Sequence, residues 1–146
     1  MTPFSNHSER LQIVASTKSL QSVREFIASV VSGHGFTDFE ENGIVLAVDE
    51  ACANLITHAF QHDPSQVIEI VVAIDHKQIQ VEISDSARPF DPKSVAQPNM
   101  DDYLRERRVG GLGISLMRRV MDDIRYVPAS PGQPRNTLFL TKRRTA

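Results

Sequence analysis

The chain has 146 residues, a formal net charge of −2 at pH 7 and a single cysteine. This length predicts one domain whose core needs no disulfide or metal, and the charge gives no reason to expect direct nucleic-acid binding. No apolar run approaches the roughly 20 residues that would span a bilayer, so we expect no membrane contact. The lone Cys52 fits a reducing compartment and a cytoplasmic protein.

Apolar periodicity and turn residues predict the order β-α-α-β-β-loop-α-β-β. Residues 1–9 are expected to be a flexible arm, and residues 10–146 a single domain. The expected elements are strands at 11–15, 67–74, 79–85, 124–127 and 137–141, and helices at 20–31, 41–61 and from about 114 to 121. Thr17 or Ser19 is expected to cap the first helix. This order predicts an α+β fold with helices on one face of a mostly antiparallel sheet.

The second expected helix carries the most informative pattern. Glu50, Asn54 and His58 are spaced four apart, which places them on neighbouring turns of one helix face. A separate apolar stripe lies beside them and consists of Ile44, Val48, Ala51, Leu55 and Ala59. Because the polar groups border the core, they could line a pocket. A carboxylate can take a proton and an amide oxygen can bind a hard cation, which suits phosphate chemistry.

Two further features follow the hairpin. Asp85 ends its second strand, where a pocket-floor carboxylate could accept a hydrogen bond from an exocyclic amine such as that of adenine. Phe90 could shield the ring or pack in the core. The run Gly110-Gly-Leu-Gly113 leads into a helix, where free N–H groups and the helix dipole favour an anion. Taken singly, Asp85 could also be a solvated carboxylate at a strand end, and the glycine run could be a flexible segment that leads into a helix.

In this order and spacing, these motifs resemble the Bergerat-fold ATP-binding superfamily, which includes gyrase and the histidine kinases. Within it, the chain is most similar to the bacterial anti-sigma-factor serine/threonine kinases, from about Leu11 to Lys142. The matching segments are 47–60 (the N-box), 85–92 (the first glycine box), 110–126 (the second glycine box and its helix) and 136–142 (the last strand). The resemblance implies a two-layer α/β sandwich of the Bergerat type.

The resemblance also assigns roles to single residues. Asn54 would bind a Mg²⁺ ion that bridges the ATP phosphates, Glu50 would be the general base, and Asp85 would read the adenine amine. Residues 92–109 would form a lid, whose Arg105, Arg107 or Arg108 could reach the phosphates. The other residues expected to bind the nucleotide are Ala87, Phe90, Gly110, Gly111, Leu112, Gly113 and Thr137.

One position departs from the family pattern. Ala87 stands where the first glycine box usually has Gly, which lets the backbone approach a ligand closely. The extra methyl group is expected to weaken ATP binding modestly. Outright loss is not expected, because Glu50, Asn54, Asp85 and the second box all remain.

The resemblance implies an ATP-dependent serine/threonine protein kinase that is also an anti-sigma factor. It would phosphorylate a STAS-type anti-sigma-factor antagonist in a partner-switching pathway, hold a sigma factor, and form a homodimer. The alternative is a binding module of the same fold that sequesters a regulatory partner with little or no kinase activity. A third hypothesis, the catalytic half of a histidine kinase, ranks below both, because we find no room for a dimerisation helix pair with a phosphoacceptor histidine.

Three other features have plain interpretations. His58 and His62 are four apart, but no third ligand for a transition metal lies nearby in the sequence. Cys52 is expected to be a buried, inert thiol. The basic segment 142–144 is expected to be a solvated terminus, with contact to an acidic partner as the alternative.

Overall fold

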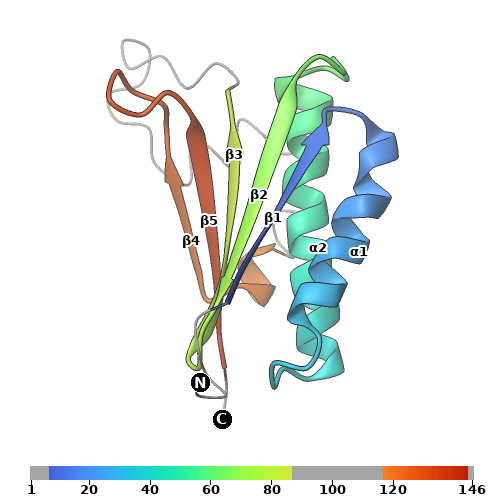
Figure 1. Cartoon of the computed structure of the whole chain (residues 1–146), viewed down its shortest axis with the longest axis vertical. Helices are drawn as coiled ribbons and strands as arrows, with labels where there is room; N and C mark the ends of the chain where they lie inside the picture. The colour runs from blue at the N-terminus through green and yellow to red at the C-terminus, as the bar shows by residue number, and fades with distance from the viewer. Residues whose placement is uncertain (1–6, 87–116, 145–146) are drawn as a thin grey trace.

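The described part of the chain forms two layers, a five-stranded antiparallel sheet and helices on one of its faces, of which α1 (Leu20–Val31) and α2 (Asp38–Asn54) are the two long ones (Figure 1). The computed structural model describes residues 7–86 and 117–144. In chain order the elements are β1 (His7–Val14), a 3-10 turn (Thr17–Ser19), α1 (Leu20–Val31), α2 (Asp38–Asn54), a π-helical turn (Leu55–Ala59), β2 (Val67–Ile74), β3 (Gln78–Asp85), β4 (Asp123–Val127) and β5 (Asn136–Arg143). This arrangement confirms the expected α+β class, and the strand order is β1-β2-β3-β5-β4.

Hydroxyl side chains cap the 3-10 turn and α2, whereas α1 starts without a side-chain cap. Ser16 accepts a hydrogen bond from Lys18 N (3.3 Å) at the 3-10 turn. Ser19 stands at the N-cap position of α1, as one of the two expected residues, but its side chain makes no capping hydrogen bond. α2 begins at Asp38, three residues before the expected start, because Thr37 and Glu40 form a capping box. Helix α1 ends as expected, with Gly33 at φ +81°.

The sheet is slightly larger than the sequence predicts. β1 begins at His7, which pairs with Ile74 of β2, so residues 7–9 of the expected arm belong to the sheet. β2 has the expected bounds, and β3 pairs with it through the turn at residues 75–77. In that turn the Asp75 carboxylate accepts hydrogen bonds from Lys77 N (2.7 Å) and Gln78 N (2.9 Å).

The core lies between the sheet and the helices. Strand residues alternate between the two faces, and the inward row is apolar over most of its length: Ile68, Ile70, Val72, Ile74, Ile79, Val81, Ile83, Leu138 and Leu140 are buried. The helix side supplies the expected stripe, in which Ile44, Val48, Ala51 and Leu55 are buried. Gly43 lies where α2 meets the helical segment 117–120, since a Cβ atom there would come within 3.0 Å of Val120.

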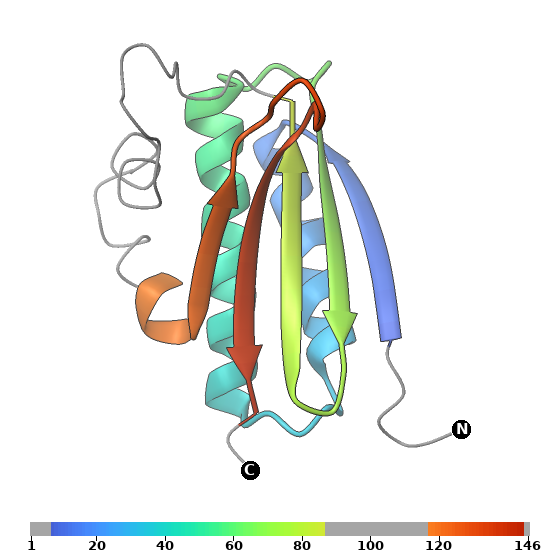
Figure 2. The same ribbon diagram turned by 90° about the vertical axis from the view of Figure 1, so that its left-hand side faces the viewer.

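Two orthogonal views locate the end of the molecule that carries the predicted motifs. The C-terminal end of α2, the end of β3 and the start of β5 lie at the same end of the molecule (Figures 1 and 2). The sheet therefore brings residues near positions 54, 85 and 136 into one region, although they are far apart in the sequence.

Candidate functional site

A buried polar pair interrupts the apolar inward row at this end of the sheet. Asp85 follows Ile83 in the inward row of β3, and Asn136 precedes Leu138 in that of β5. Asp85 is 3% exposed and Asn136 is fully buried. Asn136 Nδ2 donates a hydrogen bond to Asp85 Oδ1 at 3.1 Å. The carboxylate expected to read adenine is therefore buried and already held by a neighbouring strand.

The connection between β4 and β5 fixes this pair from the other side. The Asn136 Oδ1 atom accepts a hydrogen bond from Ala129 N at 2.8 Å. Arg135 Nη2 donates to the main-chain oxygen of Ser84 at 3.0 Å, next to Asp85. Asn136 is not among the site residues expected from the sequence. It could have been found from strand alternation, because it shares a sheet face with the buried Leu138 and Leu140, where an apolar residue is expected.

Asn54 is a second buried polar residue and the last residue of α2. Its side chain is 2% exposed, and within residues 7–86 and 117–144 its Oδ1 atom has no hydrogen-bond partner. A buried acceptor without a partner costs about 1–3 kcal/mol in desolvation. Such an atom calls for an explanation, and a bound ligand or cation is one.

The backbone changes its winding directly after Asn54. Residues 55–59 form a π-helical turn, and Phe60 N donates to the Leu55 carbonyl at 2.9 Å. Gln61 and His62 then adopt positive φ angles of 49° and 63°, which end the helix before Asp63. The sequence predicts the length of this segment but not its π winding. Single π turns inside helices are frequent at functional sites.

Glu50 lies one turn before Asn54 and is half-buried. Burial, and then the neighbouring Asp49 carboxylate, raise the pKa of Glu50 above its ordinary value. Asp49 is in turn paired with Arg24 of α1, whose Nε lies 3.0 Å from Asp49 Oδ1. A raised pKa brings a carboxylate closer to the working pH of a general base.

The remaining residues of the expected helix face behave differently. His58 is exposed, and the described ranges contain no group of three His, Cys, Asp or Glu side chains able to hold a metal ion. Cys52 is fully buried, and burial raises the pKa of its thiol, in line with an inert core residue. Thus only Glu50 and Asn54 of this face lie at the border of the core.

The structure does not bring Thr137 together with Asp85. Thr137 pairs with Ser84, so by strand alternation it lies on the sheet face opposite to Asp85 and Asn136. Other expected site residues lie outside the described residues: Ala87, Phe90, Gly110, Gly111, Leu112, Gly113 and the lid at 92–109 with Arg105, Arg107 and Arg108.

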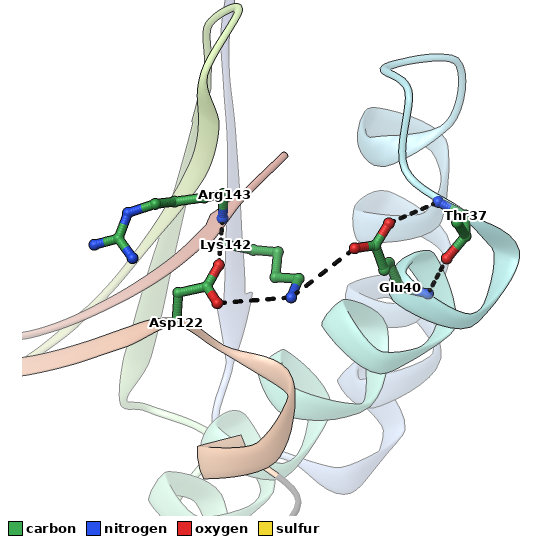
Figure 3. Close-up of polar contacts among 5 residues, drawn as sticks. All are labelled: Thr37, Glu40, Asp122, Lys142 and Arg143. Atoms are coloured by element: carbon green, nitrogen blue, oxygen red, sulfur yellow. Dashed lines mark hydrogen bonds and ion pairs between the residues drawn. The ribbon is translucent and has the colours of Figure 1, made fainter. Parts of the chain in front are cut away.

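The basic C-terminal segment is not the solvated terminus expected from the sequence. Lys142 belongs to β5, and its Nζ lies 3.8 Å from Asp122 Oδ1 and 4.0 Å from Glu40 Oε2 (Figure 3). Asp122 Oδ2 also accepts a hydrogen bond from Arg143 N at 2.6 Å. The expectation is wrong because Lys142 faces inward, in register with Ile79, and meets acidic groups of its own chain.

Known proteins share this fold and sequence pattern. Residues 13–142 match the family described as the histidine kinase-like ATPase domain. The serine-protein kinase RsbW of Bacillus subtilis (strain 168) is 28% identical over 120 residues, which cover 79% of this chain and 74% of that protein. RsbW of Listeria monocytogenes serovar 1/2a is 27% identical over 119 residues, covering 79% and 76%. The resemblance inferred from the motifs is therefore confirmed.

A solved structure supports the fold. The crystal structure of the RsbU and RsbW domains of a Mycobacterium tuberculosis protein has a TM-score of 0.63 at 13% identity. The match covers 94% of this chain and 32% of that one, so this chain corresponds to about a third of the longer protein. Among the residues that the structure describes, none of the helices is both long and apolar enough to span a membrane.

Proposed function

We propose that the chain binds ATP and transfers the γ-phosphate to a serine or threonine of a partner protein, because it belongs to the histidine kinase-like ATPase domain family. The observation that carries this proposal is the buried Asn54 Oδ1, which has no partner among the described residues. Asn54 lies one turn after Glu50 and is the last residue of α2, and Asp85 is the last residue of β3. These two element ends lie at the same end of the molecule (Figure 1). A proton acceptor, an oxygen ligand and a base-reading carboxylate are thus gathered in one region.

The donor atoms of this region fit a magnesium ion. Mg²⁺ prefers oxygen ligands and is usually held by one or two protein groups together with substrate phosphates. Asn54 Oδ1 is such an oxygen, and we propose that it is the protein's ligand to Mg²⁺. When bound with the nucleotide, Mg²⁺ supplies neutralisation of the phosphate charge.

Glu50 is proposed as the general base. The hydroxyl oxygen of the partner's serine or threonine would form a bond to the γ-phosphorus, the bond from that phosphorus to the ADP oxygen would break, and the hydroxyl proton would pass to Glu50. Burial and Asp49 raise the pKa of Glu50, which makes the ionised carboxylate a stronger base. Asp85 would accept a hydrogen bond from the adenine amine.

The partners are proposed from the relatives. The relatives from Bacillus and Listeria are named serine-protein kinase RsbW, which supports a serine/threonine kinase. We propose from the family resemblance that it also acts as an anti-sigma factor. We propose a STAS-type anti-sigma-factor antagonist as the phosphorylated substrate and a sigma factor as the alternative partner. We also propose a homodimer and a cytoplasmic location.

Phosphate transfer from labelled ATP to a STAS-domain protein tests the function. Glu50→Ala is expected to keep Mg-ATP binding and lose transfer, whereas Asn54→Ala is expected to lose both. Glu25→Ala, an exposed glutamate of α1, is the matched control and should leave both unchanged. ATP binding without transfer to any STAS protein would refute the kinase and favour a binding module. Equal Mg-ATP affinity in wild type and Asn54→Ala would refute the metal assignment.

A further inference from the structure

We propose that Asn136 is a positioning residue that fixes Asp85 for recognition of the purine 6-amine, and that it thereby sets a preference for adenine nucleotides. This inference rests on the proposed function, since it assumes that the nucleotide lies against Asp85. The residue pair is formed by register partners on β3 and β5, both at least nine-tenths buried.

Two partners among the described residues determine the orientation of the Asn136 amide. Its Oδ1 accepts from Ala129 N at 2.8 Å, and its Nδ2 donates to Asp85 Oδ1 at 3.1 Å. A flipped amide would set the NH₂ group against a backbone donor and its oxygen against a carboxylate, which accepts only. Asp85 therefore always meets a hydrogen-bond donor from β5.

The backbone that holds the amide is itself braced. Ser130 and Gln133 exchange backbone hydrogen bonds of 2.8 and 2.9 Å, which close the turn that follows Ala129. Arg135 Nη2 donates to the Ser84 carbonyl at 3.0 Å and ties the far side of the turn to the end of β3. The position of the Ala129 N–H group, and with it the amide of Asn136, is thus fixed by contacts on both sides.

A carboxylate held in this way discriminates between purines. An ionised carboxylate has about four lone-pair sites, so the bond from Asn136 does not by itself fill its capacity to accept from a ligand. The 6-amine of adenine donates, whereas the 6-oxo group of hypoxanthine accepts and would oppose Asp85. Sites that pair a buried polar group with a substrate N–H reject analogues that lack it strongly. A fixed carboxylate keeps this rejection, and a carboxylate free to rotate loses part of it.

The test compares the affinities of ATP and inosine triphosphate, which differ in the 6-substituent, for the full chain with Mg²⁺. Wild type is expected to prefer ATP by at least about a hundredfold. Asn136→Asp keeps the acceptor for Ala129 N but faces Asp85 with a second carboxylate. We expect ATP affinity to fall at least about tenfold and inosine triphosphate affinity to change little, so that the preference shrinks. Asn42→Asp, the same change on the exposed face of α2, should leave the preference unchanged.

A swap of the two side chains tests the contact itself. The double variant Asp85→Asn with Asn136→Asp restores one donor and one acceptor in the pair. We expect it to recover thermal stability and part of the ATP preference relative to Asn136→Asp. If Asn136→Asp does not fold, the double variant alone tests the inference. A hydrogen bond retained between residues 85 and 136 should keep its affinity for ATP above its affinity for inosine triphosphate.

The outcomes separate this inference from the proposed function. A folded Asn136→Asp protein with the wild-type preference overturns the inference and leaves ATP binding intact. A swap variant without any ATP preference also overturns it. A wild-type chain that binds neither nucleotide overturns the proposed function, and the inference falls with it.

Discussion

Replacement of Asn54 by leucine separates a structural role from a ligand-binding role. Leucine has the same branching at Cγ but no polar atom. The Asn54 side chain is 2% exposed, and its Oδ1 has no partner among the described residues. If the amide is retained for a ligand, its removal should relieve the ligand-free fold and abolish Mg-ATP binding.

The expected size of the effect follows from the burial of that oxygen. Removing an unpaired buried acceptor returns about 1–3 kcal/mol, and the larger methyl groups cost about 1 kcal/mol or more in overpacking. We therefore expect a net stabilisation of about 1 kcal/mol, which raises Tm by about 3 °C for a chain of this size. Mg-ATP affinity should fall by at least about tenfold, because even indirect partners of a metal ligand are typically worth that much.

Thermal unfolding with and without Mg-ATP measures both effects. Mg-ATP at 100 times the wild-type Kd should stabilise wild type by about 2.7 kcal/mol, and at the same concentration Asn54→Leu should gain about 1.4 kcal/mol or less. Thr141→Val is the matched control, because Thr141 is also buried and polar but lies near the other end of β5. A less stable Asn54→Leu protein that still gains the wild-type shift would refute the reasoning and make Asn54 a structural residue.

Three further predictions concern stability. Burial raises the pKa of Glu50, so the folded state disfavours the ionised carboxylate and loses stability as pH rises through the folded pKa. Glu50→Gln should therefore raise Tm at pH 8 but not below the ordinary glutamate pKa. Equal gains in Tm at both pH values would contradict this. Thr37→Ala removes the capping box of α2 and should cost about 1 kcal/mol in chemical unfolding; no loss would mean that the cap is dispensable. Lys142→Met leaves Glu40 and Asp122 without their shared cation and should cost about 1 kcal/mol at low salt, and a loss that persists in 1 M salt would point to packing instead.

The fold could be predicted because most local signals agree with it. The largely β-branched run Val67–Ile74 and the alternation after Gln78 predict β2 and β3 nearly to the residue. The errors lie at element ends. His7–Glu9 are polar and carry no strand pattern, and only pairing with β2 makes them part of the sheet. Thr37 and Glu40 form a capping box that is present in the sequence, whereas the apolar periodicity alone predicts a later start for α2.

The site was predicted less completely, because its key contacts join distant segments. Asn54 and Glu50 follow from spacing on one helix, and Asp85 from its place at a strand end. The bond between Asp85 and Asn136 joins residues 51 apart and depends on the register of β3 and β5. The family resemblance predicts Thr137 as a nucleotide-binding residue, whereas strand alternation places its neighbour Asn136 on the same sheet face as Asp85.

Three of the buried polar residues, Asn54, Asp85 and Asn136, argue for one site rather than several isolated exceptions. Along β3 the inward row is apolar until Asp85. Along β5 it is apolar at Leu138 and Leu140 and polar at Asn136, and α2 ends at Asn54. These three changes fall at the same end of the molecule (Figure 2). Polar residues that are buried for unrelated local reasons would have no reason to gather at one end of the molecule, as these three do. Because a fold departs from its own patterning mainly where function requires it, this end is where nucleotide binding should be sought.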